Sequence, residues 1–458
     1  MVSIAVIAFL SIGALLSLAL DVFTKNRSYV KIAVYLTCIV ALFFAIKLWD
    51  FTGYYFSKLV FIDRMGIFAA VLAILATFFV LLMSETYVPL MGIKDNEYYY
   101  LLLLATAGAV AMLFTDHLVV LFVAMELMSV ASYALAGIRK KDPLSTEAAI
   151  KYVLLGVLTS GIYVLGLAFI LGATGTFRIY DASLNSSLFN LIGAVLLLSA
   201  LMFKVSMVPF HVWTPDVYQG APTPITAYFS TVPKIAGFVA LIRLSGYLAY
   251  LPVLTFFLGA VILTLVYANF VALRQKDVKR LLAYSSIAHA GYLGMGILLG
   301  EAQAWVVLFY LAVYTFMNIG AFSVVAAMLE GDREFTSLES YEGLGYSYPW
   351  LGAGMTLMLV SLAGFPPTGG FLAKFYLFSR VLFAGWTWLV VLAVLMSLLS
   401  VYYYLRVVVQ MYMKSLEGKV GIYQYNIGAN LALFAGILIV LELGIFPQTL
   451  LFLLRFGI

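Results

Sequence analysis

Long apolar stretches separated by short polar breaks run through almost the whole chain. A helix that crosses a bilayer needs roughly 20 mostly apolar residues, and cutting the sequence at its polar or turn-rich segments leaves about 14 such stretches. The pattern therefore predicts an all-α polytopic membrane protein. The predicted spans are residues 2–21, 30–48, 64–84, 98–114, 117–137, 146–172, 187–209, 224–250, 252–273, 281–299, 303–330, 350–380, 386–413 and 428–447.

Composition removes the main alternatives to this class. Of the 458 residues, 64% are hydrophobic and only 10% are charged, and the mean hydropathy is +1.07, so no large soluble domain fits. The one cysteine, Cys38, excludes a disulfide framework, a thiolate zinc site or an iron–sulfur cluster within this chain. Residues 2–21 lack a basic leader and a clear cleavage site, and we expect them to be a retained span.

The basic residues predict an orientation, because Lys and Arg in short loops stay on the cytoplasmic side. Loops after odd-numbered spans hold Lys25, Arg27, Lys31, Lys94, Arg139, Lys140, Lys141, Arg274, Lys276, Lys279, Arg280, Arg333, Lys414 and Lys419. The other side holds Lys58, Arg64, Arg178, Arg380 and Arg455. Both termini are therefore expected on the outer side. The net charge of +5 reflects this topology, and no basic patch with interleaved aromatics indicates nucleic acid binding.

Five basic residues lie deep inside predicted spans. On insertion scales a charge at the bilayer centre costs roughly 2.5–3.5 kcal/mol, so such residues do not persist on a lipid-facing surface without a partner or a role. We expect a hydrated polar line through the interior of the bundle. The five residues are Lys151, Lys204, Lys234, Arg243 and Lys374.

Prolines interrupt two of the predicted spans. Pro209 removes the intrahelical partner of the Val205 carbonyl, and Pro366 and Pro367 do the same to the carbonyls of residues 362 and 363. In hydrocarbon a freed carbonyl must bind water or a cation. Lys204 and Lys374 lie close enough in sequence to serve, although a proline kink that only shapes packing is the simpler alternative.

The two breaks also predict an internal symmetry. Spans seven and twelve run in opposite directions by the loop count, and broken helices at matching places in inverted halves point to an ion site near the midplane. We expect an N-terminal three-helix segment (1–97), a first repeat of spans four to eight (98–250), a second, inverted repeat of spans nine to thirteen (251–413) and a C-terminal helix (414–458).

Glu126 lies near mid-depth in the fifth span, and we expect Lys204 to be its partner. Moving a carboxylate toward or away from a buried lysine changes the proton affinity of the lysine, so such a pair can act as a switch; a static ion pair is the alternative. Lys234 lands near the midplane in span eight, and Lys374 is its counterpart in the second half. Arg243 does not lose its proton at accessible pH and is expected to fix structure.

The role of several other polar residues stays open at this stage. Lys151 follows Glu147 by one turn and is either a relay residue or an anchor at the end of its helix. His289 is either a proton relay, since histidine titrates near neutral pH, or a satisfied structural donor. His211 follows the break and gates it or caps it. Asp116 and His117 are expected in a solvated turn.

Three motifs identify a family. FKVSMVPFHVWTPDVYQGAPTP (203–224), QKDVKRLLAYSSIAHAGYL (275–293) and SLAGFPPTGGFLAKFYLF (361–378) resemble the antiporter-like membrane subunits of respiratory complex I and its relatives. The TPDVYQGAPTP stretch is most similar to the N-type subunits, the equivalent of mitochondrial subunit 2. The sister L- and M-type subunits usually read LPDA in place of TPDV.

The resemblance implies a set of site residues. Glu126 and Lys204 match the family's glutamate of span five and lysine of span seven, and Lys234 matches the central lysine of span eight. Lys374 matches the ionisable residue of broken span twelve, whereas Lys151 and His289 match relay positions in spans six and ten. Pro233, directly before the central lysine, departs from the small residue expected there and puts the local helix geometry in doubt.

The resemblance also implies an activity that this chain performs only within a complex. It implies proton translocation driven by electron transfer in partner subunits, with quinone, flavin and iron–sulfur clusters on those partners and no cofactor or metal in this chain. The implied partners are L- and M-type antiporter-like subunits, small A-, J- and K-type subunits and a hydrophilic redox arm.

Three alternatives remain open from the sequence. The first is a subunit of an Mrp-type cation/proton antiporter, which shares the fold, although the TPDVYQGAP signature argues against it. The second is a relative linked to ferredoxin, a deazaflavin or hydrogen instead of NADH. The third is a structural spacer that does not pump, against which the four midplane ionisable residues speak. Absence of a phosphate-binding glycine loop, a Ser/His/Asp arrangement or a CxxC pair leaves hydrolysis, nucleotide use and electron carriage unsupported.

Overall fold

The chain folds into a bundle of long helices. The computed structural model describes residues 2–24, 27–93, 96–414 and 425–457. Within these ranges, ten helices are long and apolar enough to cross a membrane by length and composition, and three shorter apolar helices accompany them. Lys25, Lys94 and Lys419, which count toward the expected orientation, lie outside the described residues. The prediction of an all-α polytopic membrane protein is confirmed at this level.

The N-terminal part of the bundle contains five helices and a small hairpin at one of its ends. Helix α1 packs on α2 and α4, and α4 packs on α5. Helix α3 begins after Asp63, whose carboxylate accepts a hydrogen bond from the Gly66 amide at 2.8 Å and so caps the first turn. The elements are α1 (Val2–Thr24), α2 (Arg27–Lys47), η1 (Leu48–Asp50), β1 (Gly53–Tyr55), β2 (Val60–Ile62), α3 (Arg64–Leu90), α4 (Glu97–Leu113) and α5 (Leu118–Ala136).

The next part holds the first interrupted helix and the most buried helix of this half. Helix α6 packs on α8 and α9, and α10 packs on α3 and α13. Every residue of α10 is buried, which means that its polar side chains face protein and not lipid. The elements are α6 (Pro143–Thr174), α7 (Ile179–Ala182), α8 (Leu188–Lys204), α9 (Trp213–Gly220), α10 (Thr223–Arg243) and η2 (Leu244–Ala249).

The remaining helices surround α13, which is also buried along its whole length. Helix α13 contacts α10, α15, α16 and α18. The elements are α11 (Leu251–Ala272), α12 (Val278–Ile297), η3 (Glu301–Gln303), α13 (Ala304–Ala327), β3 (Leu329–Glu330), β4 (Arg333–Glu334), η4 (Leu338–Tyr341), α14 (Leu344–Ser347), α15 (Pro349–Ala363), α16 (Gly369–Phe383), α17 (Thr387–Met413), α18 (Ile427–Ile445) and α19 (Gln448–Gly457).

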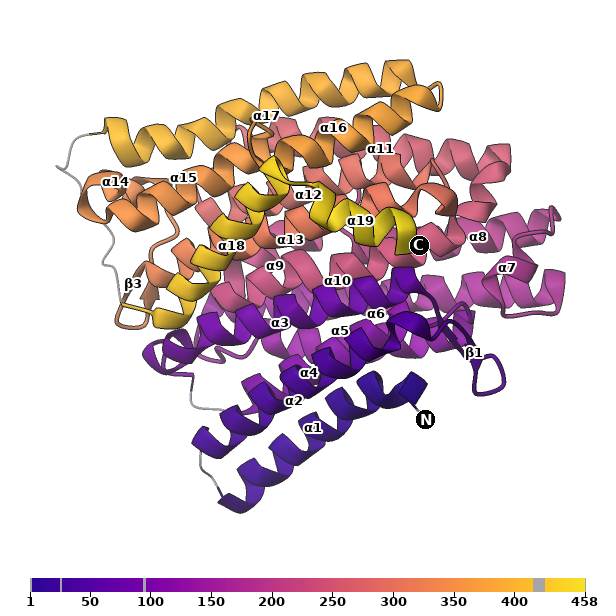
Figure 1. The fold of residues 1–458 in the computed structure, drawn as a ribbon, viewed down its shortest axis with the longest axis horizontal. Coiled ribbons are helices and arrows are strands. Elements are labelled where there is room, and N and C mark those ends of the chain that lie inside the picture. Colours follow the sequence, from indigo (N-terminus) through magenta and orange to yellow (C-terminus); the bar gives the residue numbers. More distant parts are fainter. Residues whose placement is uncertain (1, 25–26, 94–95, 415–424, 458) are drawn as a thin grey trace.

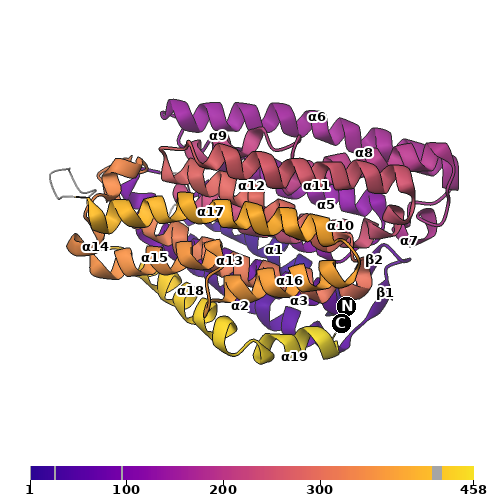
Figure 2. The same ribbon diagram turned by 90° about the horizontal axis from the view of Figure 1, so that it is seen from above.

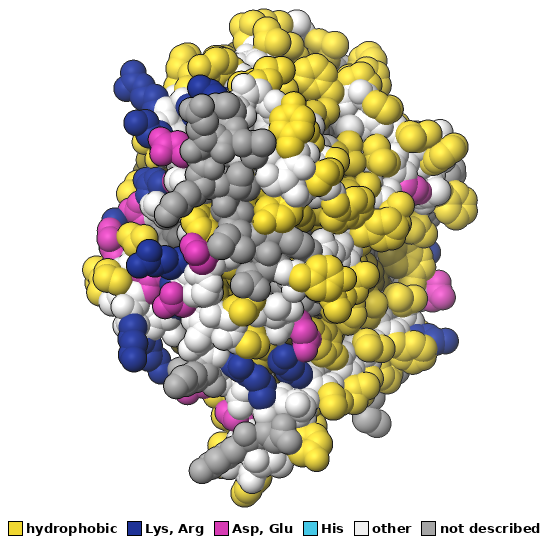
Figure 3. Space-filling view, turned by 90° about the vertical axis from the view of Figure 1, so that its left-hand side faces the viewer, with side chains coloured by type: hydrophobic (Ala, Val, Ile, Leu, Met, Phe, Trp, Pro, Cys, Tyr) yellow, Lys and Arg dark blue, Asp and Glu magenta, His cyan; other side chains and the backbone are white. Residues whose placement is uncertain are grey.

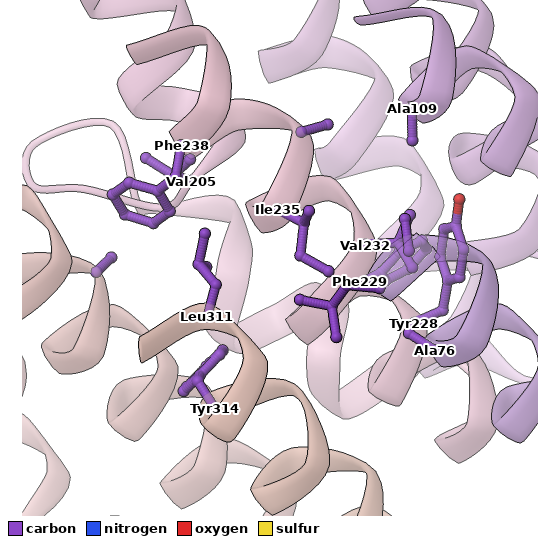
Figure 4. Close-up of a cluster of buried hydrophobic side chains, with 14 of the residues drawn as sticks. Ala76, Ala109, Val205, Tyr228, Phe229, Val232, Ile235, Phe238, Leu311 and Tyr314 are labelled. Atoms are coloured by element: carbon purple, nitrogen blue, oxygen red, sulfur yellow. The ribbon is translucent and has the colours of Figure 1, made fainter. Parts of the chain in front are cut away.

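The long helices lie side by side with their axes roughly aligned, and α10 and α13 are in the middle (Figure 1, Figure 2). Outer helices such as α6 and α17 expose rows of large apolar side chains, including Leu154, Val157 and Leu398. A surface this apolar fits lipid or membrane partners and not water. Around α10, Val232, Ile235 and Phe238 lie in a buried apolar cluster with Leu311 and Tyr314 of α13 (Figure 4).

The end of the bundle that carries β3 and β4 also carries most of the basic loops. We call it the basic end and define it by Arg139, Lys140, Lys141, Arg274 and Arg333. Figure 3 looks onto this end and shows Lys, Arg, Asp and Glu side chains gathered over part of it, beside a hydrophobic area. The opposite end carries β1, β2 and both chain ends (Figure 1).

Both predicted helix breaks are present, which confirms that part of the fold prediction. Helix α8 ends at Lys204 and α9 begins at Trp213, so Pro209 lies in a non-helical link. Helix α15 ends at residue 363 and α16 begins at residue 369, and Pro366 and Pro367 lie in the link between them. In contrast, α10 continues through Pro233 without interruption.

Candidate functional site

Lys374 binds the carbonyl groups at the second break, as its position in the sequence suggested. Its ammonium donates to the carbonyl oxygens of Leu362 and Ala363, both at 2.9 Å, and to the Ser397 hydroxyl of α17 at 2.9 Å. These carbonyls are the two that Pro366 and Pro367 deprive of an intrahelical donor. The expectation that a lysine would satisfy them is therefore confirmed for this break.

Lys204 at the first break behaves differently. Its ammonium is buried and donates to the Ser129 hydroxyl of α5 at 2.7 Å, and it lies 5.9 Å from the centre of the Tyr133 ring. Glu126 accepts a hydrogen bond from the Ser160 hydroxyl of α6 at 2.6 Å. The expectation that Lys204 would bind carbonyls freed by Pro209 is wrong for the contacts that the structure describes.

The direct pairing of Glu126 with Lys204 is also absent from the ion pairs of the described residues, which corrects that expectation. Ser129 lies one helical turn after Glu126 on α5 and takes the ammonium in place of the carboxylate. Glu126 itself is half-buried and turns toward α6. The two charged groups are thus connected through residues one turn apart on α5.

Residues at the first break pack directly against α10, the helix that carries the central Lys234. A Cβ atom at Gly237 of α10 would lie 2.5 Å from Cγ1 of Val205 and 3.9 Å from Cβ of Lys204. A side chain at this position would force Val205 to move, so glycine allows the end of α8 to approach α10 closely. Gly237 follows Lys234 by three residues, so the contact places the end of α8 within one turn of the central lysine.

Lys234 lies at the centre of the bundle on the fully buried helix α10. Its ammonium donates to the carbonyl oxygen of Ser286 in α12 and lies 5.8 Å from the centre of the Tyr314 ring. The Ser286 hydroxyl accepts from Tyr314 at 2.9 Å and bonds the Tyr218 hydroxyl at 3.2 Å. The ammonium thus contacts a carbonyl and an aromatic ring, with a cluster of three hydroxyl groups nearby, and it forms no ion pair among the described residues.

Helix α12 connects Lys234 with Lys374. Ser286, His289 and Tyr292 recur every three residues and share one side of the helix. The His289 and Tyr292 rings are 5.7 Å apart between centres, and the Lys374 ammonium lies 5.2 Å from the centre of the Tyr292 ring. The two lysines therefore lie along one side of α12 with ionisable and hydroxyl-bearing side chains between them, and the contacts of Tyr292 with His289 and Lys374 involve its ring.

Tyrosines complete the surroundings of His289, and the sequence analysis did not single them out. The Tyr310 hydroxyl bonds Nδ1 at 2.8 Å, and the Tyr404 hydroxyl bonds Nε2 at 3.3 Å. Tyr404 also bonds the Ser285 hydroxyl. Both ring nitrogens thus have a hydroxyl partner that can donate or accept, which suits a relay as well as a fixed histidine.

Lys151 lies away from this row. Its ammonium pairs with Glu147 and with Asp216 of α9, both at 2.5 Å, and 40% of its side chain is exposed. Asp216 also pairs with Arg280 of α12 at 2.6 Å. From the sequence, two roles are open for Lys151, a relay residue or an anchor at the end of its helix. These contacts favour the anchor, since Lys151 joins α6 to α9, the helix that follows the first break.

His211 lies within the first break, and Arg243 lies at the end of α10. His211 is buried in the first break, and its ring packs edge-on against the Tyr267 ring with 4.8 Å between centres. The Arg243 guanidinium donates hydrogen bonds to both carboxylate oxygens of Asp63 at 2.9 Å and to the Leu113 carbonyl at 3.0 Å. This bidentate contact ties α10 to the cap of α3, as a structural role for Arg243 would require.

The expectation of a solvated turn at Asp116 is wrong. The Asp116 side chain is fully buried, accepts a hydrogen bond from the Tyr54 hydroxyl at 2.9 Å and pairs with Arg178 at 3.2 Å. Tyr54 lies on β1 and Arg178 directly precedes α7, so the hairpin β1–β2 and the start of α7 cover the turn. Burial lowers the pKa of the neighbouring His117, and Asp116 offsets part of that effect.

The comparisons with known proteins place this arrangement in a family. The family model described as NADH:quinone oxidoreductase/Mrp antiporter, TM, matches residues 115–400. The chain belongs to this antiporter-like family. A subunit N of NADH-quinone oxidoreductase from Trichlorobacter lovleyi is 41% identical over 439 residues, which cover 93% of this chain and 89% of that protein. A subunit N from Salinibacter ruber is 44% identical over 349 residues, 74% of this chain and 70% of that protein.

Solved structures agree with the placement. A chain in respiratory complex I from Thermus thermophilus with bound aureothin has a TM-score of 0.86 at 32% identity and covers 97% of this chain and 98% of its own. A chain of the Mrp complex from Dietzia sp. DQ12-45-1b also has a TM-score of 0.86, but at 20% identity that likeness shows the fold alone. The family resemblance expected from the three motifs is confirmed.

The described part of this antiporter-family chain contains no group of three or more His, Cys, Asp or Glu side chains placed to hold a metal ion. The buried ionisable groups of the row, Lys234, His289 and Lys374, contact hydroxyl and carbonyl groups of neighbouring helices. Such groups can exchange a proton with a neighbour. The chemistry that this site supports is thus proton transfer along the bundle interior.

Proposed function

We propose that this chain is a proton-translocating membrane-arm subunit of a complex I-type redox pump, most similar to subunit N of NADH-quinone oxidoreductase. The observation that carries the proposal is the row from Lys234 through Ser286, His289 and Tyr292 to Lys374. A row of this kind in a fully buried part of the bundle gives a proton a route where lipid would not. The relatives that carry the subunit N name, at 41% identity over 93% of this chain, support it.

In this proposal Glu126 and Lys204 form the switch, Lys234 is the central proton carrier and Lys374 is the exit residue. Energy released by electron transfer changes the charge near Glu126, and the end of α8 transmits the change to α10 through the Gly237 contact. Lys151 has a supporting role through Asp216. The chain is then part of an oxidoreductase that acts as a translocase, and no electron passes through it.

The proposal extends to the finer architecture. We assign about 14 transmembrane helices, because α12 and the three shorter apolar helices add to the ten long ones. Two inverted repeats, 98–250 and 251–413, follow a three-helix segment 1–97 and precede the C-terminal part 414–458. The two broken helices, each with a buried lysine at the break, support the repeats.

Partners and orientation follow from the same assignment. The family's structures come from multi-subunit membrane complexes, so we assign membrane-arm neighbours of the L, M, A, J and K types and a hydrophilic redox arm that carries quinone, flavin and iron–sulfur clusters. The basic end is assigned to the cytoplasm and both termini to the outer side, because Lys and Arg gather at the basic end. The chain is assigned to a prokaryotic cell membrane.

An Mrp-type antiporter subunit is the second candidate function, since the Dietzia chain shares the fold. The identity to it is 20%, whereas the identity to the Trichlorobacter subunit N is 41%. The redox-driven assignment is therefore favoured.

Lys204→Ala in the intact complex tests the proposal. Removing the ammonium next to Ser129 should lower the rates of proton pumping and coupled electron transfer together. Lys276→Ala, an exposed lysine in the loop between α11 and α12, is the matched control and should leave both rates unchanged. Pumping and electron transfer at control rates in an assembled Lys204→Ala complex would count against the switch.

A further inference from the structure

Glu334 is a buried carboxylate at the basic end that the row of lysines does not include. It belongs to β4, in the segment that follows α13, and only 8% of its side chain is exposed. Oε2 pairs with the Lys279 ammonium of α12 at 3.0 Å. Oε1 accepts hydrogen bonds from the Thr223 hydroxyl at 2.5 Å, from the Thr223 amide at 3.2 Å and from the Tyr87 hydroxyl. A residue of the β3–β4 hairpin thus contacts α3, α10 and α12.

The carboxylate occupies the start of the helix that carries the central lysine. Helix α10 begins at Thr223, and Lys279 reaches past Glu334 to the carbonyl oxygen of Ala221 at the end of α9, at 2.6 Å. The amide groups at a helix start favour a negative charge. Glu334 is therefore held as an anion at the junction of α9 and α10, in contact with the first hydroxyl of α10.

Helix α10 has one polar side that runs from this junction to Lys234. With 3.6 residues per turn, residues 223, 227, 230 and 234 fall on one side of the helix. They are Thr223, Ala227, Ser230 and Lys234, all buried. The opposite side carries Tyr228, Val232 and Ile235, which lie in the apolar cluster (Figure 4). The path along the axis is about 16 Å, with the small side chain of Ala227 between the two hydroxyl groups.

A polar cavity at the basic end lies next to the chain segment that carries Glu334. A cavity of about 630 Å³ lies between the ends of α3 and α5 and the tip of the β3–β4 hairpin. Arg139, Lys141, Asp142, Asp332 and Arg333 are among its lining residues. Arg333 directly precedes Glu334, and the α3 part of the wall begins at Leu90, one turn after Tyr87. Glu334 thus contacts the start of α10 directly, and the residues just before it in the hairpin line the cavity.

We infer that Glu334 is the proton-loading residue for Lys234, taking protons from the cavity at the basic end and passing them along the Thr223–Ser230 side of α10. A hydronium ion in the cavity gives its proton to the carboxylate, and an O–H bond forms while Lys279 keeps its charge. The proton then moves through the Thr223 and Ser230 hydroxyls and intervening water to the neutral amine of Lys234. Glu334 returns to the carboxylate, which leaves the charge balanced. This inference rests on the proposed function and on the cytoplasmic assignment of the basic end.

The competing explanation is a structural ion pair that only fastens the β3–β4 hairpin. Glu334→Gln keeps the shape and the hydrogen-bonding oxygen but removes the acid. The double variant Glu334→Gln/Lys279→Met also removes the unpaired ammonium that the single variant would leave buried, which restores charge balance. A structural role is recovered in the double variant, whereas a proton-loading role is not.

The experiment uses the intact complex in vesicles with the basic end facing the medium. Glu334→Gln and the double variant should both slow proton uptake and coupled electron transfer by roughly ten-fold or more, because a positioned acid is lost. The control Glu330→Gln, exposed on β3 of the same hairpin, should match the wild type. In Glu334→Ala, formate added on the basic side should restore part of the rate, since a small acid fits the vacated space.

Wild-type rates in Glu334→Gln, full recovery in the double variant or no response of Glu334→Ala to formate would each overturn the inference. Lys234→Met, measured in parallel, separates this failure from that of the proposed function. If Lys234→Met slows pumping while Glu334→Gln does not, the proposed entry route through Glu334 is rejected and the proposed function is retained. A wild-type rate in Lys234→Met removes the proposed function as well.

Discussion

The Lys374 ammonium lies 2.9 Å from the carbonyl oxygen of Ala363, the last residue of α15 before the second helix break. The same ammonium binds the carbonyl of Leu362 and the hydroxyl of Ser397. One side chain therefore stabilises the break and ends the row of polar groups that starts at Lys234. The structural and the proposed proton-carrying roles of Lys374 are consequently combined in one group.

Lys374→Met should impair both roles. It leaves the Leu362 carbonyl without this donor and the Ala363 carbonyl with only the long 3.5 Å hydrogen bond from Ser397, where an unsatisfied buried carbonyl costs about 1–3 kcal/mol, and it removes the proposed exit residue. We expect a lower midpoint temperature of the purified complex and a large loss of pumping. Lys374→Arg keeps a donor but binds its proton too tightly to release it, so it should recover stability without recovering pumping. Recovery of both by Lys374→Arg would contradict an exit role.

Tyr404→Phe tests the histidine relay. The substitution removes the hydroxyl that bonds Nε2 of His289 at 3.3 Å and bonds Ser285. A lost hydrogen bond of about 1.4 kcal/mol in the transfer step corresponds to roughly ten-fold in rate, so pumping should fall by up to that factor. Tyr402→Phe is the matched control, because Tyr402 precedes it on α17 and is 62% exposed. Equal rates in the two variants would exclude Tyr404 from the relay.

The Glu334–Lys279 contact predicts a pH-dependent stability at the basic end. Burial alone would raise the pKa of the Glu334 carboxyl, but the Lys279 ammonium and its hydrogen bonds hold it below its ordinary value of 4.5. A lowered pKa in the folded chain means that the contribution is complete above the unfolded value and is lost as the pH falls through the folded value. Wild-type stability should therefore drop below about pH 4.5.

Thermal unfolding of the membrane complex between neutral and acid pH measures this effect. Glu334→Gln should be less stable than the wild type at neutral pH, and the difference between the two should shrink as the medium becomes acidic. Glu330→Gln provides the baseline for the other carboxylates of the hairpin. A difference that stays constant over the whole pH range would show that the ionised form of Glu334 contributes nothing to stability.

The hydrophobic pattern was a good guide to the helices and their breaks because both follow from local chemistry. Apolar runs of sufficient length form helices in a bilayer. A proline removes the hydrogen bond that its amide would donate to the carbonyl four residues earlier. For this reason the contacts of Lys374 with residues 362 and 363 could be expected from sequence positions alone. Lys204 has the same local setting, yet it turns to Ser129 of another helix, which no local rule specifies.

Contacts between distant segments account for the rest of the differences. Asp116 reads as a solvated turn residue until the hairpin with Tyr54 covers it, and that hairpin lies about 60 positions away in the sequence. The tyrosines around His289 count as apolar in a periodicity analysis, although their hydroxyl groups determine the site. Glu334 lies in a polar loop, and only the fold shows that it is inserted at the start of α10. Tyr310 and Tyr314 are four residues apart on α13 and therefore share one side of that helix. This spacing is a sequence signal that could have indicated the hydroxyl groups around His289 and Ser286.

The most direct measurement is the number of protons pumped per electron pair by the reconstituted complex with Lys234→Met. Lys234 is buried between Ser286 and Tyr314, and in this account every proton that the chain moves passes through its amine. The predicted result is an assembled complex whose pumping falls sharply, while Lys276→Met retains the wild-type ratio and rate. A Lys234→Met complex that pumps at the wild-type ratio and rate would contradict the account.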